Sequence, residues 1–105
     1  MARTPRSVVI IGGGISGLST AFALYEQAAA ADVALTCTIL DAAPVWGGKI
    51  VTHRVGQLVM EAGPDSFLSQ KPWGMELCRR LGIADQLINT NPVEKKASVL
   101  RGGQL

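Results

Sequence analysis

Three glycines near the N-terminus are the residues whose spacing points most directly to a chemistry. Gly12, Gly14 and Gly17 form the pattern Gly-x-Gly-x-x-Gly. In this pattern the first glycine permits a tight turn, the second lets the backbone approach a pyrophosphate, and the third lets a helix pack closely on a strand. The N–H groups at the start of that helix attract phosphates. The spacing therefore predicts a turn that binds a dinucleotide.

The flanking residues predict the elements that must hold this turn. Residues 8–11 are an apolar, β-branched run before the glycines, typical of a strand buried on both faces of a parallel sheet. From residue 15 to about residue 30 the apolar side chains follow a helical period. Residues 35–40 predict a second strand. The order strand, helix, strand indicates an α/β fold with a βαβ unit.

The second predicted strand is followed by an acid. Asp41 comes 24 residues after Gly17, a few more than the roughly 20 usual for the acid that binds a ribose hydroxyl. Residues 28–32 can absorb the difference in a longer helix or loop. A carboxylate at this place repels a 2′-phosphate, which favours FAD or NAD over NADP. The alternative is a glycine turn with a purely structural role.

A second glycine pair selects between the two cofactors. Gly47 and Gly48 follow Asp41 closely, and Lys49 comes directly after them. This arrangement resembles the flavin oxidase superfamily that includes monoamine oxidases and phytoene desaturases. In that superfamily the Gly-Gly-Arg/Lys segment passes the adenosine and phosphate side of FAD, which Lys49 would approach. The alternative is a plain loop with a solvated lysine.

The segment from Glu61 to Leu68 narrows the resemblance. Its sequence, Glu-Ala-Gly-Pro-Asp-Ser-Phe-Leu, resembles a characteristic run of the porphyrinogen oxidases of haem synthesis, which act on protoporphyrinogen or coproporphyrinogen III. The similarity extends over essentially the whole chain from Val8. It implies a Rossmann-like FAD-binding fold and FAD contacts in four stretches of this sequence. These residues are Gly12, Gly13, Gly14, Ile15, Ser16, Gly17, Asp41, Ala42, Gly48, Lys49, Gly63, Pro64, Asp65 and Ser66.

Two residues depart from the pattern of that family. Asp41 stands where the family usually has a glutamate, so the carboxylate is one methylene shorter and its reach to the ribose needs a slight loop shift. Trp46 precedes the glycine pair, where smaller or basic residues are more familiar. Neither departure removes the resemblance.

The rest of the chain predicts a hairpin, helices and a second hairpin. Residues 49–53 and 58–61 read as two strands around Gly56 and Gln57. A helix is expected to begin near Pro72 and to stop at Gly82, with a helical turn over residues 84–88. Phe67 and Trp73 are expected in the core.

The last residues predict a strand over residues 97–100 and a turn at Gly102 and Gly103. The return strand would begin at Gln104, one residue before the chain ends. We therefore expect residues 1–105 to be the N-terminal part of an FAD-binding domain, an incomplete domain with the substrate domain absent.

Composition excludes several classes of function. The net charge is +2 and the basic residues are scattered, which argues against a nucleic-acid partner. Cys37 and Cys78 lack the spacing of a metal site, so we expect two buried thiols and no metal. The apolar run before the glycines is too short for a signal peptide, and a cytoplasmic protein is expected. Contact with a membrane surface and the oligomeric state stay open.

The resemblance implies an FAD-dependent oxidase that converts a porphyrinogen to the porphyrin, with dioxygen as the acceptor. No catalytic acid, base or nucleophile can be named among these residues. Two alternatives remain at this point: another flavin enzyme of the same fold, such as an amine oxidase or a carotenoid desaturase, and a non-catalytic nucleotide-binding fragment. A dehydrogenase that uses NAD would leave the second glycine pair and the Gly63–Ser66 run without a role.

Overall fold

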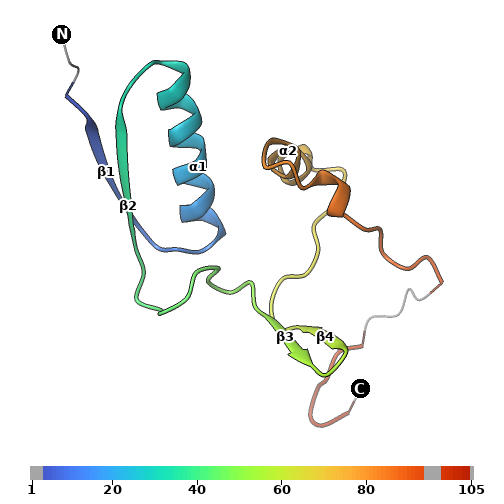
Figure 1. The fold of residues 1–105 in the computed structure, drawn as a ribbon. Coiled ribbons are helices and arrows are strands. Elements are labelled where there is room, and N and C mark those ends of the chain that lie inside the picture. Colours follow the sequence, from blue (N-terminus) through green and yellow to red (C-terminus); the bar gives the residue numbers. More distant parts are fainter. Residues whose placement is uncertain (1–3, 94–97, 105) are drawn as a thin grey trace. The chain divides into compact units, whose positions relative to one another are not determined.

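The computed structural model describes residues 4–93 and 98–104. The chain divides into two compact units, Met1–Ser66 and Phe67–Leu105. Figure 1 shows the helices and strands in chain order. They are β1 (Arg6–Ile11), α1 (Ile15–Ala30), β2 (Leu35–Leu40), β3 (Thr52–Val55), β4 (Leu58–Glu61), α2 (Pro72–Arg80) and the short 3₁₀ helix η1 (Ala84–Gln86).

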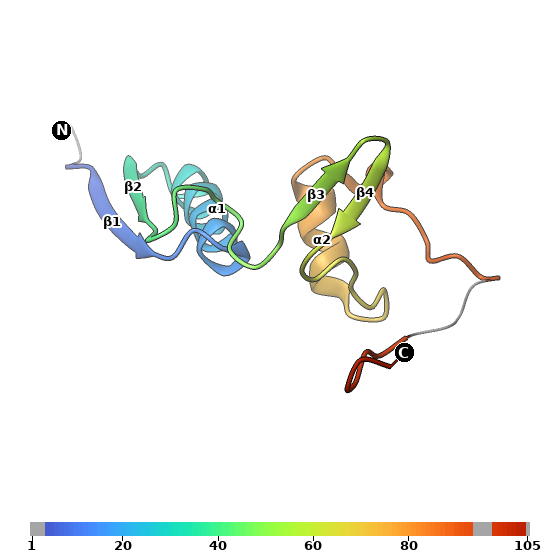
Figure 2. The same cartoon turned by 90° about the horizontal axis from the view of Figure 1, so that it is seen from below.

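The first unit begins with the expected strand–helix–strand. Strands β1 and β2 pair in parallel, with Arg6 opposite Leu35 and Ile11 opposite Leu40. Helix α1 contacts both strands and lies along one face of the pair (Figures 1 and 2). A parallel pair joined through a helix is the arrangement on which Rossmann-like folds are built.

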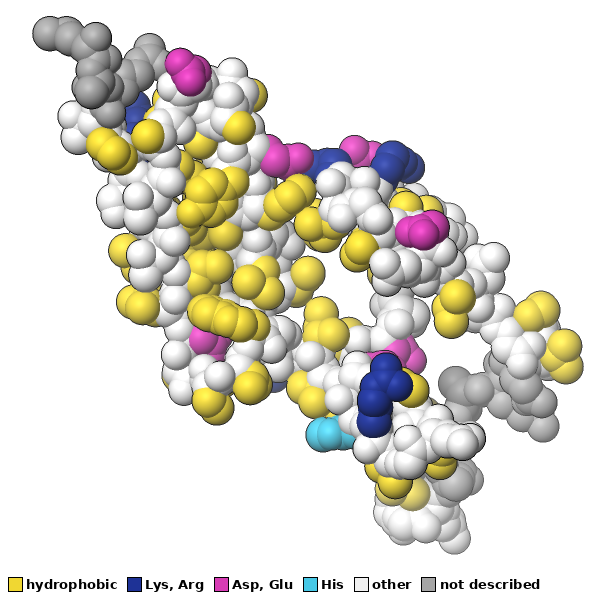
Figure 3. All heavy atoms as spheres, viewed as in Figure 1, with side chains coloured by type: hydrophobic (Ala, Val, Ile, Leu, Met, Phe, Trp, Pro, Cys, Tyr) yellow, Lys and Arg dark blue, Asp and Glu magenta, His cyan; other side chains and the backbone are white. Residues whose placement is uncertain are grey.

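The expectation that β1 is buried on both faces is wrong. Burial alternates along the strand, because only one face lies against α1: Val8 and Ile10 are partly covered, whereas Val9 is 57% exposed and Ile11 79% exposed. Among the described residues, Ala21 of α1 is the one buried apolar side chain. Figure 3 shows apolar side chains, in yellow, at many places on the surface.

Helix α1 has the predicted bounds, and its end has a local cause. Asp32 adopts a left-handed backbone conformation with φ of 51°. The N–H groups of Asp32 and Val33 donate back to the carbonyls of Ala29 and Ala28, as in the motif that commonly ends helices. The Tyr25 hydroxyl accepts a hydrogen bond from the N–H of Cys37 at 3.3 Å, which ties the helix to β2.

The turn between β1 and α1 needs glycine at two of its positions. Gly12 has φ of 105°, which L side chains rarely adopt. A Cβ on Gly17 would lie 1.8 Å from the carbonyl oxygen of Gly12, so only glycine lets α1 pack this closely on the turn. The roles predicted for the first and third glycines of the pattern are thus confirmed.

The hairpin β3–β4 has the predicted turn but a shifted first strand. Val55 pairs with Leu58 across Gly56 and Gln57, and β4 has the expected bounds. The first strand begins at Thr52 and not at residue 49, because the N–H of Ile50 donates to the carbonyl of Gly47 and closes a turn there.

In the second unit, α2 begins at Pro72 as predicted. It ends before Gly82, whose φ of 72° allows its N–H to bond back to Arg79. The helical turn expected over residues 84–88 is shorter than predicted, and η1 spans Ala84–Gln86.

The aromatic residues of this unit are not in a core. Phe67 is 49% exposed and its ring lies against Gly74, while Trp73 is 74% exposed. Because both side chains are exposed, the expectation that they lie in a core is wrong.

The second predicted hairpin is reduced to one bridge. Arg101 and Gln104 pair around Gly102 and Gly103, which both have positive φ, so the turn is where it was expected. Residues 98–100 form no strand. Residues 97 and 105, the outer ends of the two predicted strands, lie outside the described residues.

Substitution of Gly17 tests the close packing of helix on turn. We expect Gly17→Ala to lower the free energy of unfolding by about 1–3 kcal/mol, since the added methyl overlaps a backbone carbonyl that cannot rotate away. Urea unfolding of the ligand-free full-length protein measures the loss. Gly14→Ala is the matched control, because its Cβ would come no closer than 3.8 Å to another atom. Equal stability of the two variants would contradict the packing role.

Candidate functional site: a groove between two glycine segments

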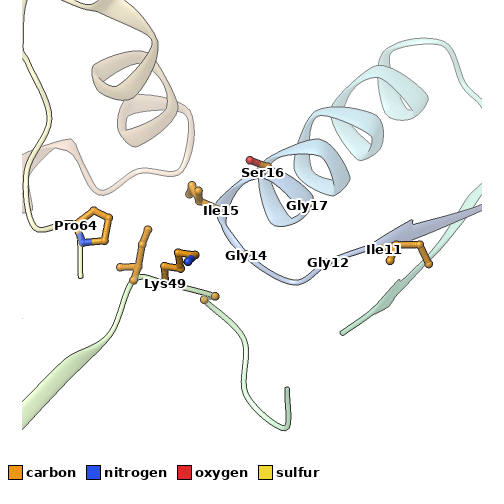
Figure 4. A pocket seen from close by; sticks show the side chains of 11 residues that line it. Ile11, Gly12, Gly14, Ile15, Ser16, Gly17, Lys49 and Pro64 are labelled. Carbon is orange, nitrogen blue, oxygen red and sulfur yellow. The ribbon is translucent and has the colours of Figure 1, made fainter. Parts of the chain in front are cut away.

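A groove of 440 Å³ opens where the glycine turn meets the loop after Trp46. Figure 4 shows Ile15 and Ser16 at the start of α1, with Lys49 and Pro64 on the other side of the groove. The wall is therefore formed by the end of β1, the first turn of α1 and the second glycine segment. The lining residues are Ile11, Gly12, Gly14, Ile15, Ser16, Gly17, Gly47, Gly48, Lys49, Ile50 and Pro64.

The two glycine segments touch through their backbones. The N–H of Gly47 donates to the carbonyl of Gly13 at 2.9 Å, and Gly14 and Gly47 form an isolated parallel bridge. A Cβ on Gly48 would lie 3.1 Å from the Cα of Gly14, and Gly48 has φ of 61°. The second pair is thus glycine because it approaches the first pattern and turns in the left-handed region.

The start of α1 gives this groove its capacity to bind anions. The first hydrogen bond of the helix runs from Leu18 N–H to Gly14 C=O, so the N–H groups of residues 15–17 precede the helix's own ladder. The N-cap is Gly14, which has no side chain to occupy those groups, and the first turn carries no acid. With Lys49 in the wall, the groove combines a helix N-terminus and a cation, which is suited to phosphate.

The Gly63–Ser66 run reaches the groove only in part. A Cβ on Gly63 would lie 1.9 Å from the carbonyl oxygen of Lys49, so Gly63 packs directly on the second glycine segment. This contact brings Pro64 to the wall. Asp65 and Ser66 are exposed and bond to each other, with the Ser66 hydroxyl 3.0 Å from the Asp65 carboxylate.

Asp41 lies behind the glycine turn and not in the wall of the groove. Its Oδ2 accepts a hydrogen bond from the N–H of Gly13 at 2.5 Å, and its Oδ1 accepts one from the N–H of Ala43 at 2.7 Å. Both backbone bonds hold the pKa of the Asp41 carboxyl below its ordinary value of 3.8, and the bond from Ala43 has a larger effect than the bond from Gly13. Ala42, which lies between Asp41 and Ala43, is exposed.

The predicted site residues therefore fall into two groups. Eight of them line the groove: Gly12, Gly14, Ile15, Ser16, Gly17, Gly48, Lys49 and Pro64. The other six lie outside its wall: Gly13, Asp41, Ala42, Gly63, Asp65 and Ser66.

Sequence reasoning missed three lining residues, which are Ile11, Gly47 and Ile50. The two isoleucines carry no chemical signal in the sequence, because an apolar residue beside a glycine looks like part of a strand or core. Gly47 belongs to the glycine pair, so the pair itself was a signal that could have included it.

The environment of Asp41 predicts a dependence of stability on pH. Because the folded state lowers the pKa of this carboxyl, its contribution to stability is present above the ordinary value of 3.8 and is lost as the pH falls below it through the folded-state pKa. Asp41→Asn should thus be less stable than the parent at pH 7, and the difference should shrink as the pH falls below 3.8. Urea unfolding of both proteins across this range measures it. A difference that stays constant with pH would contradict the role of the charge.

No group of three or more metal-ligating side chains gathers among residues 4–93 and 98–104. None of their helices is both long enough and apolar enough to cross a membrane.

Comparison with known proteins points to one family. The model of the family described as flavin containing amine oxidoreductase matches residues 15–105. Coproporphyrinogen III oxidase of Bacillus subtilis (strain 168) is 39% identical over 89 residues, which are 85% of this chain and 19% of that protein. The chloroplastic protoporphyrinogen oxidase of Oryza sativa subsp. japonica is 37% identical over 93 residues, 87% of this chain and 16% of that protein.

A solved structure agrees with these relatives. The crystal structure from Exiguobacterium sp. 255-15 whose description names protoporphyrinogen oxidase superposes with a TM-score of 0.66 at 34% identity, over 80% of this chain and 18% of that one. The chain thus spans between 16% and 19% of the length of these three proteins. The resemblance to porphyrinogen oxidases seen in the sequence is confirmed, and the chain belongs to the flavin containing amine oxidoreductase family.

Proposed function

We propose that this chain is the N-terminal part of an FAD-binding domain and that its groove holds the pyrophosphate of FAD. The observation that carries this proposal is the junction of the two glycine segments at the start of α1. There the backbone N–H groups of residues 15–17 and the cation of Lys49 face one groove. The family to which the chain belongs is described by its flavin, and FAD is the flavin that carries a pyrophosphate.

The residues present fit a dinucleotide. Gly14 lines the groove without a side chain, and a Cβ there would meet nothing closer than the Cα of Gly48 at 3.8 Å. The space that a side chain would take at residue 14 is therefore left to a ligand. Asp41, fixed behind the turn by two backbone bonds, is the acid that we assign to the ribose. The acid excludes a 2′-phosphate by charge.

The full-length protein is, in this proposal, an oxidase that converts a porphyrinogen to the porphyrin in haem biosynthesis. The substrate is coproporphyrinogen III or protoporphyrinogen IX, as the names of the relatives suggest. The oxidation proceeds in three two-electron steps, each of which delivers a hydride and a proton and reduces one dioxygen to hydrogen peroxide. FAD supplies the hydride acceptor when it is bound. The residues of this chain bind and orient the cofactor, and none of them is assigned to proton transfer.

Flavin retention is the direct test of the groove. We expect Gly14→Val to purify with little or no flavin, because the added side chain fills the space proposed for the pyrophosphate. Flavin absorbance per protein, measured on the full-length protein, gives the result. Ala29→Val is the matched control, since it adds the same side chain to an exposed position of α1 away from the groove. A normal flavin content in the Gly14 variant would overturn the assignment of the groove.

The reaction is tested by mixing the purified full-length protein with coproporphyrinogen III in air, and in parallel with protoporphyrinogen IX. A flavin spectrum together with growing porphyrin fluorescence and peroxide is the expected outcome. Flavin without porphyrin from either substrate would leave the cofactor assignment in place and reject the substrate. It would favour an amine oxidase or a desaturase of the same family.

A further inference from the structure

Trp46 covers the backbone of the glycine turn at Gly13 and is not among the residues that line the groove. Gly13 is buried, although the glycines on both sides of it are only partly covered. A Cβ on Gly13 would lie 2.2 Å from Cε3 and 2.5 Å from Cζ3 of the Trp46 indole. The six-membered ring of the indole therefore occupies the place that a side chain at residue 13 would take.

The carboxylate of Asp41 lies at the same face of Gly13. Its Oδ2 is 3.2 Å from the ideal Cβ position at residue 13, close to the point that the indole approaches. An acid and an aromatic ring thus flank one short stretch of backbone, directly beside the start of the groove. Both come from the segment that follows β2.

This pair is held in place by the backbone. Gly13 donates its N–H to Asp41 and accepts the N–H of Gly47, the residue after Trp46. The acid and the residue next to the indole are therefore anchored to the backbone of the same residue, Gly13. The indole itself remains 60% exposed. A large aromatic face that is anchored at its base and open to solvent can accept a ligand with little loss of conformational entropy.

We propose that Trp46 contacts the adenine of the dinucleotide and is a positioning residue for its adenosine half. This inference rests on the proposed function, in which Asp41 takes the ribose hydroxyls. The carbon that bears the 2′-hydroxyl is bonded to the carbon that bears the base, so a ribose held by Asp41 brings its base next to the neighbouring indole. Purine bases and indole rings attract each other through their faces.

The competing explanation is that Trp46 only shields Gly13 and stabilises the turn. The two roles predict different ligand dependence. Loss of a shield would weaken every ligand of the turn alike, whereas loss of an adenine contact would weaken only ligands that contain adenine.

The test compares FAD with FMN, which lacks the adenosine, on the full-length apoprotein. We expect Trp46→Leu to weaken FAD about tenfold, the size of one stacking contact, and to leave FMN unchanged. Trp46→Phe keeps an aromatic face and should recover most of the affinity. Trp73→Leu is the matched control, because Trp73 is also exposed, at 74%, but lies on α2 in the second unit. Quenching of flavin fluorescence measures each affinity.

A second measurement covers the case in which FMN binds too weakly to compare. In a full-length background in which every tryptophan except Trp46 is replaced by phenylalanine, Trp73 among them, ADP should change the emission of Trp46, with a midpoint that FAD competes away. Equal loss of FAD and FMN in Trp46→Leu, unchanged FAD affinity, or an emission that ADP does not alter would each overturn the adenine contact while the FAD site stands. Failure of the unsubstituted protein to bind FAD would overturn the proposed function as well.

Discussion

The backbone of Gly13 is the point on which the rest of the first unit depends. Its N–H binds the Asp41 carboxylate at the end of β2, and its carbonyl accepts the N–H of Gly47. These two bonds join the glycine turn, the end of the second strand and the second glycine segment. The parallel pairing of β1 with β2 brings Asp41 to the turn, because the carboxyl ends of parallel strands lie at the same edge of a sheet. The groove lies between the glycine turn and the second glycine segment, which the bond between Gly13 and Gly47 holds together.

The fold was largely accessible from the sequence, and the reasons are local. The helix bounds at Ile15 and Ala30 follow from the change of hydrophobic period after the glycines, and the end of α2 follows from Gly82. The predicted start of β3 is wrong because a hydrogen bond between Ile50 and Gly47 decides where the strand begins. The secondary-structure propensity of neither residue indicates this bond. The predicted burial of β1 is wrong because the burial of a strand depends on elements that pack against it from elsewhere in the sequence.

The candidate site could be predicted from the sequence less completely than the fold. Motif spacing predicted four of the five glycines that line the groove, since their positions follow from backbone geometry, and it left out Gly47. It did not predict the hydrogen bond between Asp41 and Gly13. The motif indicates only that the acid binds a ribose, and it says nothing of the group that the acid binds when no ligand is present. Nor did it predict the position of Trp46 over Gly13. The sequence shows that Trp46 departs from the family pattern. The contact of Trp46 with Gly13, however, depends on the conformation of the loop between Asp41 and Gly47.

The glycine-rich lining of the groove has a thermodynamic consequence. Five of the eleven residues that line it are glycines, whose backbone gains little from side-chain packing. Such backbone loses much conformational entropy on folding. A ligand that binds only the folded groove therefore contributes to folding by mass action. Each tenfold rise of its free concentration above the dissociation constant adds about 1.4 kcal/mol. The stability of this segment is in that sense coupled to the free concentration of the ligand that fills the groove.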